Sequence, residues 1–365
     1  MATSIRYQRH SQQRGFALAS ILWLLAGLSV LVSGVSVSLL GVAQTNADSA
    51  KQLEYKLTEQ SALADVTYLY ATHSTLGAGA GVGGRVLMLD ASVKYKVQSK
   101  LAGAALAASP AAWVTLQDEQ GLLGLNSPSV DYLAALLPRC GATAQQRSAL
   151  TDALMDYTDA DRLKRLNGAE DFEYAAAGLP PPPNRYLQHP SELWRVLGWK
   201  ALRDRWEAVG CDDSVSLRNN SRLNLYTAPA NVLVAAGLSP EQASLALADR
   251  LAYRNRAALA PYLLNLIEEK YGMQGLMRFD SRSTGEVRVS VLSEDGWMRT
   301  YQLRRMYSDV GLPFAVSPWG GRKTLAPLAD GLGATLVEDN LANFMSSTSA
   351  SPTDNNAARP PASFN

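Results

Sequence analysis

Residues 14–25 read RGFALASILWLL, and they form the junction between a basic leader and a long uncharged run. Arg6, Arg9 and Arg14 supply the basic charge, whereas residues 15–47 contain no charged side chain. The run exceeds the roughly 20 apolar residues that cross a bilayer as a helix. It is also longer than the apolar region, roughly 7–15 residues, of a removable secretory signal. The sequence therefore predicts one membrane-spanning helix close to the N-terminus.

This junction has two interpretations. The segment is either an ordinary single-pass anchor or a leader resembling that of type IV prepilins, in which a peptidase cuts between Gly15 and Phe16. Cleavage at that bond would keep the apolar helix, whereas signal peptidase would remove it. Because positive charge before a span favours the cytoplasmic side, residues 1–15 are expected to be cytoplasmic. The chain after about Asp48 is then expected in the periplasm, with a single crossing of the inner membrane.

The composition limits the classes of function. The chain of 365 residues has a formal net charge of +1, so we expect no dominant surface for a polyanion and no nucleic-acid partner. Its two cysteines, Cys140 and Cys211, both lie in the part expected to be exported. A disulfide would persist in an oxidising periplasm, and a pair of free buried thiols is the alternative. Two cysteines and three scattered histidines do not make a zinc site.

The spacing of apolar residues predicts how the chain is organised. A helix is predicted over residues 16–74, and strand-like alternation marks residues 75–125 and 280–322. Helical periodicity dominates residues 126–279, whereas residues 323–365 lack a periodic apolar face and are predicted to be disordered. The expected fold class is α+β, with a long N-terminal helix, a small antiparallel sheet and a large inserted all-α domain.

The same periodicity predicts individual elements. The expected strands are Val86–Tyr95, Ala111–Leu116, Glu286–Leu292, Trp297–Arg305 and Phe314–Trp319, and the glycine-rich Leu76–Arg85 is expected to be a flexible loop. The expected helices of the insertion are Val130–Leu137, Ala144–Tyr157, Pro190–Leu197, Lys200–Val209, Ala228–Ala236, Pro240–Arg254 and Ala260–Tyr271.

Several phrases of the sequence, taken in order, resemble one family. They are the junction at Phe16, DEQGLLGLN at 118–126, DADRLKRLNGAEDFEY at 159–174, LPPPPNRY at 179–186, SELWRV at 191–196 and LNLYTAP at 223–229. Over about residues 14–320 the chain resembles GspK, the large minor pseudopilins of type II secretion systems. The resemblance implies a pseudopilin fold with a helical insertion, at the tip of a periplasmic pseudopilus that takes part in exporting folded proteins. It also implies prepilin peptidase, pseudopilins I and J, and pseudopilin H beneath them as partners, and calcium in the insertion.

Ser20 is the fifth residue after the expected cleavage site, where pilin-like subunits generally carry glutamate. Members of the K family are similar to this chain in lacking that glutamate. A carboxylate within an apolar span is costly unless it is paired, and a subunit at the tip has no neighbour above it to supply the pairing amine. Ser20 therefore fits a tip position, although it can equally be one small residue of a membrane helix.

One acidic segment is the candidate metal site. Asp159, Asp161, Glu170 and Asp171 lie close together in the sequence, with an Asn167-Gly168 turn between them. Oxygen ligands without histidine or cysteine suit a hard cation. We place the calcium that the resemblance implies at these four residues.

This segment departs from an EF-hand. Leu163 and Lys164 stand where that loop needs an oxygen ligand and a glycine. The alternative to a metal site is a solvated acidic loop whose charge is balanced by its basic residues. Backbone carbonyls, Asp118 or Asn224 are possible further ligands.

A different function is suggested by Leu223–Arg254, which resembles the helix-hairpin-helix repeats of exported DNA-uptake proteins. Such repeats hold a phosphate beside a helix N-terminus. Here Glu241 would repel phosphate at that position, and Arg250, Arg254 and Arg256, which come later, can be explained as a solvated face. We therefore favour a structural or protein-binding role for this segment. No G-x-S-x-G, Walker A or H-E-x-x-H motif occurs in the sequence, and we expect no enzymatic activity.

We predict that a prepilin peptidase cleaves the bond between Gly15 and Phe16. Mass spectrometry of protein extracted from membranes should then show a mature chain that begins at Phe16. Gly15→Leu should block cleavage, because the larger side chain changes the residue that the peptidase must accept. A chain that still begins at Met1 or Ala2 in cells with an active peptidase would contradict the prediction.

Overall fold

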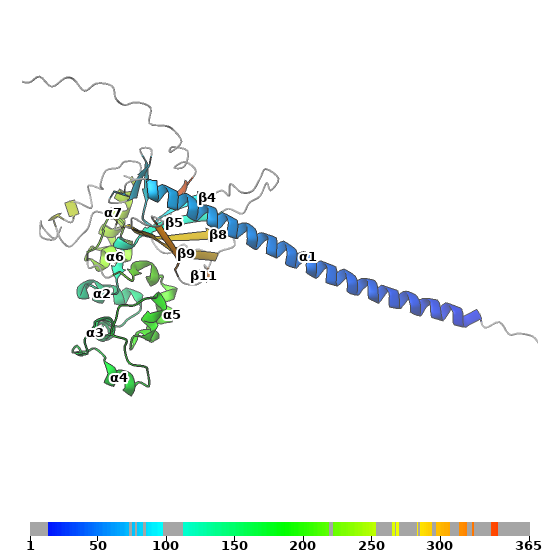
Figure 1. Cartoon of the computed structure of the whole chain (residues 1–365), viewed down its shortest axis with the longest axis horizontal. Coiled ribbons are helices and arrows are strands. Elements are labelled where there is room, and N and C mark those ends of the chain that lie inside the picture. Colours follow the sequence, from blue (N-terminus) through cyan, green and yellow to red (C-terminus); the bar gives the residue numbers. More distant parts are fainter. Residues whose placement is uncertain are drawn as a thin grey trace, which may run out of the picture. The chain divides into compact units, whose positions relative to one another are not determined.

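The computed structural model describes residues 14–72, 75–76, 79–82, 85–97, 112–218, 222–252, 265–266, 268–269, 283, 285–293, 297–306, 314–319, 323–324 and 337–341. The chain divides into two units, Met1–Lys56 and Leu57–Asn365. The described part of the first unit is helical throughout. The second unit contains a sheet and a helical insertion (Figure 1).

Helix α1 (Arg14–Thr72) contains the membrane segment expected from the sequence. From Leu18 onward it is long and apolar enough to cross a membrane, with a mean hydropathy of 2.2 in its most apolar window. Its hydroxyl groups bond within the helix: Ser29 and Ser36 each donate to the carbonyl four residues earlier at 2.8 Å. Because lipid offers no other partners to a hydroxyl, this internal bonding makes the serines compatible with a membrane helix.

The second unit is built on a sheet of strand order β10-β9-β8-β5-β4-β12, in which β11 also pairs with β9. The strands are β4 (Val93–Val97), β5 (Ala112–Asp118), β8 (Glu286–Ser293), β9 (Trp297–Arg305), β10 (Phe314–Pro318), β11 (Lys323–Thr324) and β12 (Val337–Asn340). All neighbours are antiparallel except β12, which runs parallel to β4. The predicted hairpin of β8 and β9 and the strand at β10 are confirmed.

The last turns of α1 share a core with this sheet. Val66 and Leu69 are at most 1% exposed, and they belong to the same buried cluster as Val114 of β5 and Val289 and Val291 of β8. Alternate residues of a strand point to one face, so the period-two pattern of the sequence places these valines together. Burial of this apolar face fixes the register of β8, because a slip of one residue would turn the valines outward.

The stretch between α1 and β4 differs from the prediction. β1 (Thr75–Leu76), β2 (Gly79–Val82) and β3 (Arg85–Met88) form a three-stranded sheet in place of the expected flexible loop. The single strand expected over Val86–Tyr95 is two strands, because Asp90 makes a turn in which its Oδ1 accepts the Ser92 N–H at 2.9 Å. Glycine-rich strands carry no apolar alternation, so hydrophobic periodicity could not reveal them.

The insertion lies between β5 and β8. Its helices are α2 (Val130–Leu136), α3 (Gln146–Thr158), α4 (Asp171–Ala176), α5 (Arg203–Ala208), α6 (Ala230–Ala235) and α7 (Pro240–Ala252). The helix predicted over Pro190–Leu197 is a 3₁₀ helix (Pro190–Arg195), whereas the helix predicted over Lys200–Val209 is confirmed as α5, preceded by a short 3₁₀ turn (Trp199–Leu202). The insertion is also not all-α, since β6 (Leu123–Gly124) pairs in parallel with β7 (Val215–Ser216). The helix predicted over Ala260–Tyr271 falls mostly outside the described residues.

The insertion has a core of its own. Trp199 and Trp206 are fully buried, with ring centroids 5.6 Å apart. The indole N–H of Trp199 donates to the Leu150 carbonyl of α3 at 2.9 Å, so its polar end is satisfied. Cys140 and Cys211 belong to the same core and are joined by a disulfide. The bridge ties the end of the α2 region to the segment that leads into β7.

Two short segments after residue 322 form strands, although the sequence predicted disorder from residue 323 onward. β11 pairs with β9, and β12 pairs with β4. Leu341, directly after β12, is 1% exposed and belongs to the core of the sheet. Strands this short lack a periodic pattern and depend on pairing with distant residues, which the local sequence does not reveal. The remainder of residues 325–365 lies outside the described part of the chain.

Asp118, the last residue of β5, holds the point where the chain leaves the sheet. Its fully buried carboxylate accepts hydrogen bonds from Asn224 Nδ2 at 2.9 Å, Thr227 Oγ1 at 3.0 Å, Ser283 Oγ at 2.9 Å and the Gln120 N–H at 3.2 Å. Burial raises the pKa of Asp118 to about 6, against the lowering effect of these bonds. One side chain therefore joins the start of the insertion, a segment before α6 and a residue before β8.

We predict that loss of the disulfide destabilises the insertion. Cys140→Ala together with Cys211→Ala should lower the free energy of unfolding by up to about 4 kcal/mol, because the bridge joins residues 71 apart in the sequence. Thermal unfolding followed by tryptophan fluorescence measures the change. Reductant should lower the melting temperature of the wild type and leave the double variant unaffected. Equal melting of oxidised and reduced wild type would refute the prediction.

Candidate metal centre

The acidic segment is fastened to α3 by two carboxylates one turn apart. Asp152 and Asp156 share a face of α3 because four positions separate them. Asp152 Oδ2 accepts both the backbone N–H and the side-chain amide of Asn167 at 3.1 Å. Asp156 Oδ2 accepts the Arg165 N–H at 3.2 Å, and its Oδ1 lies 3.3 Å from the Arg165 guanidinium. These bonds fold the segment between α3 and α4 back onto α3.

Gly168 is where the segment approaches α3 most closely. A Cβ atom at this position would lie 1.9 Å from Asp156 Oδ2, which no side chain permits. Glycine is therefore required at position 168 of this turn, because the Asp156 carboxylate leaves no room for a side chain. It delivers the chain to Glu170 at the start of α4.

Three of the four predicted ligands meet. Carboxylate oxygens of Asp159, Asp161 and Glu170 lie within 4.8 Å of one another. Both oxygens of Glu170 and Oδ1 of Asp159 are buried without a hydrogen-bond partner in the described part of the chain. Buried oxygens of this kind are expensive unless something else binds them. The donor set contains only oxygen, so it fits a hard cation such as calcium.

The charges of this cluster oppose one another. Burial, followed by the charges of Asp156, Asp159, Asp171 and Asp161, raises the pKa of Glu170 to about 7. The pKa of Asp159 is also raised, first by burial and then by Asp161, although Arg165 lies 3.3 Å away. The nearby arginine therefore does not cancel the repulsion. A divalent cation would do so, since it supplies two positive charges at the point where the carboxylates converge.

The fourth predicted ligand lies elsewhere. Asp171 begins α4, and its exposed carboxylate lies 3.9 Å from Arg162. Two further ligands that the sequence left open, Asp118 and Asn224, bond to each other at the base of the insertion.

Sequence reasoning missed the support around the ligands. Glu173 accepts the Glu170 N–H at 3.0 Å and binds Lys164 Nζ at 2.7 Å, which fixes the backbone of the buried ligand. Asp152 and Asp156 were detectable as acidic residues four apart on one helix. Their targets were not, because hydrogen bonds to a returning loop leave no periodic signal.

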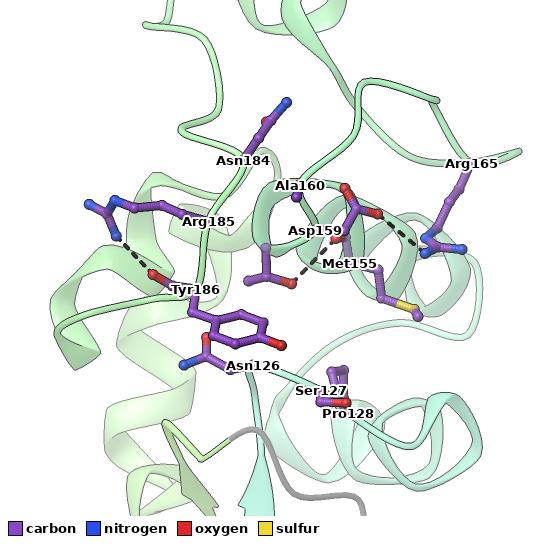
Figure 2. Close-up of a pocket in the computed structure, with 11 residues that line it drawn as sticks. Asn126, Ser127, Pro128, Met155, Asp159, Ala160, Arg165, Asn184, Arg185 and Tyr186 are labelled. Carbon is purple, nitrogen blue, oxygen red and sulfur yellow. Dashed lines mark hydrogen bonds and ion pairs between the residues drawn. The ribbon is translucent and has the colours of Figure 1, made fainter.

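A cleft lies beside the carboxylates (Figure 2). Its volume is about 530 Å³, and its walls include Met155, Asp159, Arg165, Asn184 and Tyr186. Asn184 has a positive φ of 48°, and its side-chain amide donates to the Asp161 carbonyl at 2.7 Å. Figure 2 shows the Asp159 carboxylate turned toward Arg165 on one wall. The residues after the four prolines thus support the backbone of a ligand.

The helix-hairpin-helix interpretation loses one of its three basic residues, while Arg254 and Arg256 lie outside the described residues. Arg250 of α7 is 1% exposed rather than solvated. Its guanidinium lies 3.1 Å from Asp90 and donates to the carbonyls of Tyr226 and Ala228 at 2.8 and 2.7 Å. Glu241 lies in the first turn of α7, where its carboxylate accepts from Ser239. Arg250 is therefore occupied inside the protein and is not presented to a phosphate.

The processing residues belong to α1. Gly15 and Phe16 lie in its first turn, and Ser20 follows about one turn later. The structure therefore continues the helix across the expected cleavage bond, and cleavage itself stays a prediction.

These features define a class of protein. The fold is pilin-like, with a long N-terminal helix, a small sheet packed on the end of that helix and a helical insertion between two sheet strands. The apolar part of the helix fits a single-pass membrane anchor. Residues 113–203, which include the acidic segment, match the family described as Type II secretion system (T2SS), protein K. This similarity agrees with the resemblance found in the sequence.

The chain was also compared with curated proteins and with solved structures. No curated protein matches the chain. A chain in the solved structure described as the GspK-GspI-GspJ complex from the enterotoxigenic Escherichia coli type 2 secretion system is similar to it, at 18% identity and a TM-score of 0.48. The similarity covers 77% of this chain and 99% of that chain.

We predict that protons and calcium compete for Glu170. Its pKa rises from 4.5 to about 7 on folding, so folding takes up a proton between these values. With a chelator present, the stability linked to this proton is complete below pH 4.5 and is lost as the pH rises through 7. The melting temperature of the chelated protein should therefore fall over this range. Calcium binds the ionised form, so the rise in melting temperature that it causes should grow over the same range.

Two variants sharpen this measurement. Asp161→Ala with Glu170→Ala should abolish a calcium stabilisation that amounts to about 2.7 kcal/mol at a hundredfold excess over Kd. Asp204→Asn, at an exposed acidic residue of α5, is the matched control and should keep the full effect. Identical melting of the wild type with calcium and with chelator would leave the segment as a solvated loop.

Proposed function

We propose that this protein is a minor pseudopilin that caps the tip of the type II secretion pseudopilus and takes part in exporting folded proteins across the outer membrane. The observation that carries the proposal is the protein K match over residues 113–203. The apolar helix α1 fits a single-pass anchor in the inner membrane. The basic leader supports a cytoplasmic N-terminus, with the sheet and the insertion in the periplasm.

Assembly would use the helix beyond its membrane segment. Leu53 and Leu57 are 58% and 40% exposed, which is costly for large apolar side chains in water. Packing against the helices of pseudopilins I and J, with H beneath, would bury them and gain about 25 cal/mol per Å² of apolar area. The insertion makes the subunit too bulky to repeat along a thin filament, and Ser20 removes the carboxylate that would need a subunit above. Both features favour the tip.

Calcium would serve the structure of the insertion. Asp159, Asp161 and Glu170 would hold the ion, which would neutralise their mutual repulsion. Asp152 and Asp156 keep the segment on α3, and Glu173 positions the Glu170 backbone. The surface formed by the insertion would then have one shape when the subunit reaches the tip. A structural role is proposed because the ion would join the end of α3 to the start of α4 through Asp159, Asp161 and Glu170.

We predict that deleting the gene traps exported proteins in the periplasm and leaves DNA uptake unchanged. The wild-type chain should restore export, because the tip would be complete again. Gly15→Leu should not restore it, because the unprocessed chain would stay in the inner membrane. Cell fractionation of a secreted enzyme measures the effect. Normal export together with lost transformation would favour the DNA-uptake alternative.

Single introduced cysteines test the assembly surface in the same cells. Both natural cysteines are in the disulfide, so an introduced cysteine is the one free thiol. Leu53→Cys should crosslink to a pseudopilin of the same system through a short thiol–amine reagent. Lys200→Cys, at an exposed residue of the insertion, is the matched control and should crosslink less.

A further inference from the structure

The C-terminal strand β12 covers one edge of the main sheet. It pairs with β4 in the register Val337↔Val93, Glu338↔Lys94, Asp339↔Tyr95 and Asn340↔Lys96. β12 is the parallel strand in a sheet whose other described pairings are antiparallel. Without it, β4 would be the edge strand, with a row of backbone groups open to pairing.

Two contacts hold this segment at its C-terminal end. The N–H of Leu341 donates to the Lys96 carbonyl at 3.1 Å, which extends the pairing by one residue. The Leu341 side chain is 1% exposed and lies in the same core as Val93, Tyr95 and Val97 of β4. The segment is therefore anchored by one buried side chain as well as by backbone bonds.

The charges of the two strands are complementary. β4 reads Val-Lys-Tyr-Lys-Val, with Lys94 and Lys96 between its buried residues. β12 reads Val-Glu-Asp-Asn, and its register sets Glu338 beside Lys94. Opposite charges on neighbouring strands favour pairing. The register thus aligns opposite charges at one position, whereas Asp339 is aligned with Tyr95 and Asn340 with Lys96.

We propose that the β4 edge is a strand-accepting site and that its occupant is this chain's own segment Val337–Leu341. The segment is short and parallel, and short parallel pairing is weak, so it can detach. While it is bound, it prevents β4 from pairing with another copy. This mode of recognition is the addition of a strand to a sheet edge, and it is independent of the proposed place in a pseudopilus.

Hydrogen exchange of the full chain in detergent tests the proposal. A variant that ends at Leu336 should exchange the amides of Val93–Val97 at least about tenfold faster than the wild type. A variant that ends at Ser346 keeps Leu341 and should match the wild type. The peptides of β8 and β9 should keep their protection in both variants, which shows that the sheet persists. A synthetic peptide of residues 334–345 should restore the protection of β4 in the shorter variant.

Leu341→Asp is a second, milder change that keeps the chain length. It should speed exchange in β4 alone, because it removes the buried anchor, and it decides the matter if the shorter variant fails to fold. Equal exchange of β4 in wild type, Leu341→Asp and the shorter variant would overturn the proposal. Protection of β4 that disappears on dilution would also overturn it, because the strand would then come from a second copy.

Discussion

The buried carboxylate of Asp118 is the contact on which the second unit depends. It accepts from Asn224 and Thr227, which precede α6, and from Ser283, which precedes β8. The Tyr70 hydroxyl of α1 lies 3.2 Å from Ser283 Oγ, so the end of the long helix reaches the same network. Each buried donor left unpaired costs about 1–3 kcal/mol. Asp118 thus connects the start of the insertion with the residues that precede α6 and β8, and the C-terminal end of α1 joins the same hydrogen-bond network through Tyr70.

Buried arginines contribute to how specifically the insertion docks on the sheet. Arg288 of β8 lies 3.0 Å from Glu119 and also donates to the carbonyls of Asp212 and Val215. Arg250 of α7 pairs with Asp90 and also donates to two backbone carbonyls. A buried ion pair adds little net stability compared with an apolar contact, but breaking it leaves an isolated charge. Such pairs therefore penalise every other way of docking the insertion on the sheet.

The sequence correctly predicted the elements whose apolar residues recur with a helical or strand period. The apolar N-terminal helix, β5, the β8–β9 hairpin and α3 follow from spacings of apolar residues, and three residues of the candidate metal centre follow from the density of carboxylates. Prediction from the sequence failed where the local structure depends on contacts with residues far away in the chain. The glycine-rich segment β2 forms a strand by pairing with β3, and β12 forms a strand by pairing with β4. The burial of Arg250 likewise depends on its ion pair with the distant residue Asp90. The prediction of an α-helix over Pro190–Leu197 was also wrong, because the segment is a 3₁₀ helix and local periodicity does not distinguish the two.

Two buried carboxylates show how a structural acid differs from a ligand. Burial raises the pKa of both Asp118 and Glu170, so neither burial nor pKa distinguishes them. Their surroundings do: Asp118 accepts from three side chains and one backbone N–H, whereas both Glu170 oxygens lack a partner in the described residues. The neighbours of Glu170 are instead further carboxylates, Asp159 and Asp161, which repel it. At Glu170, desolvation and charge repulsion both raise the pKa, and no hydrogen bond to its carboxylate in the described residues offsets either effect. Asp152 and Asp156 nevertheless hold the backbone of the segment on α3, which limits how far it can move to separate the charges. A bound cation would remove both the repulsion and the lack of partners, and this is the physical argument for the candidate metal centre.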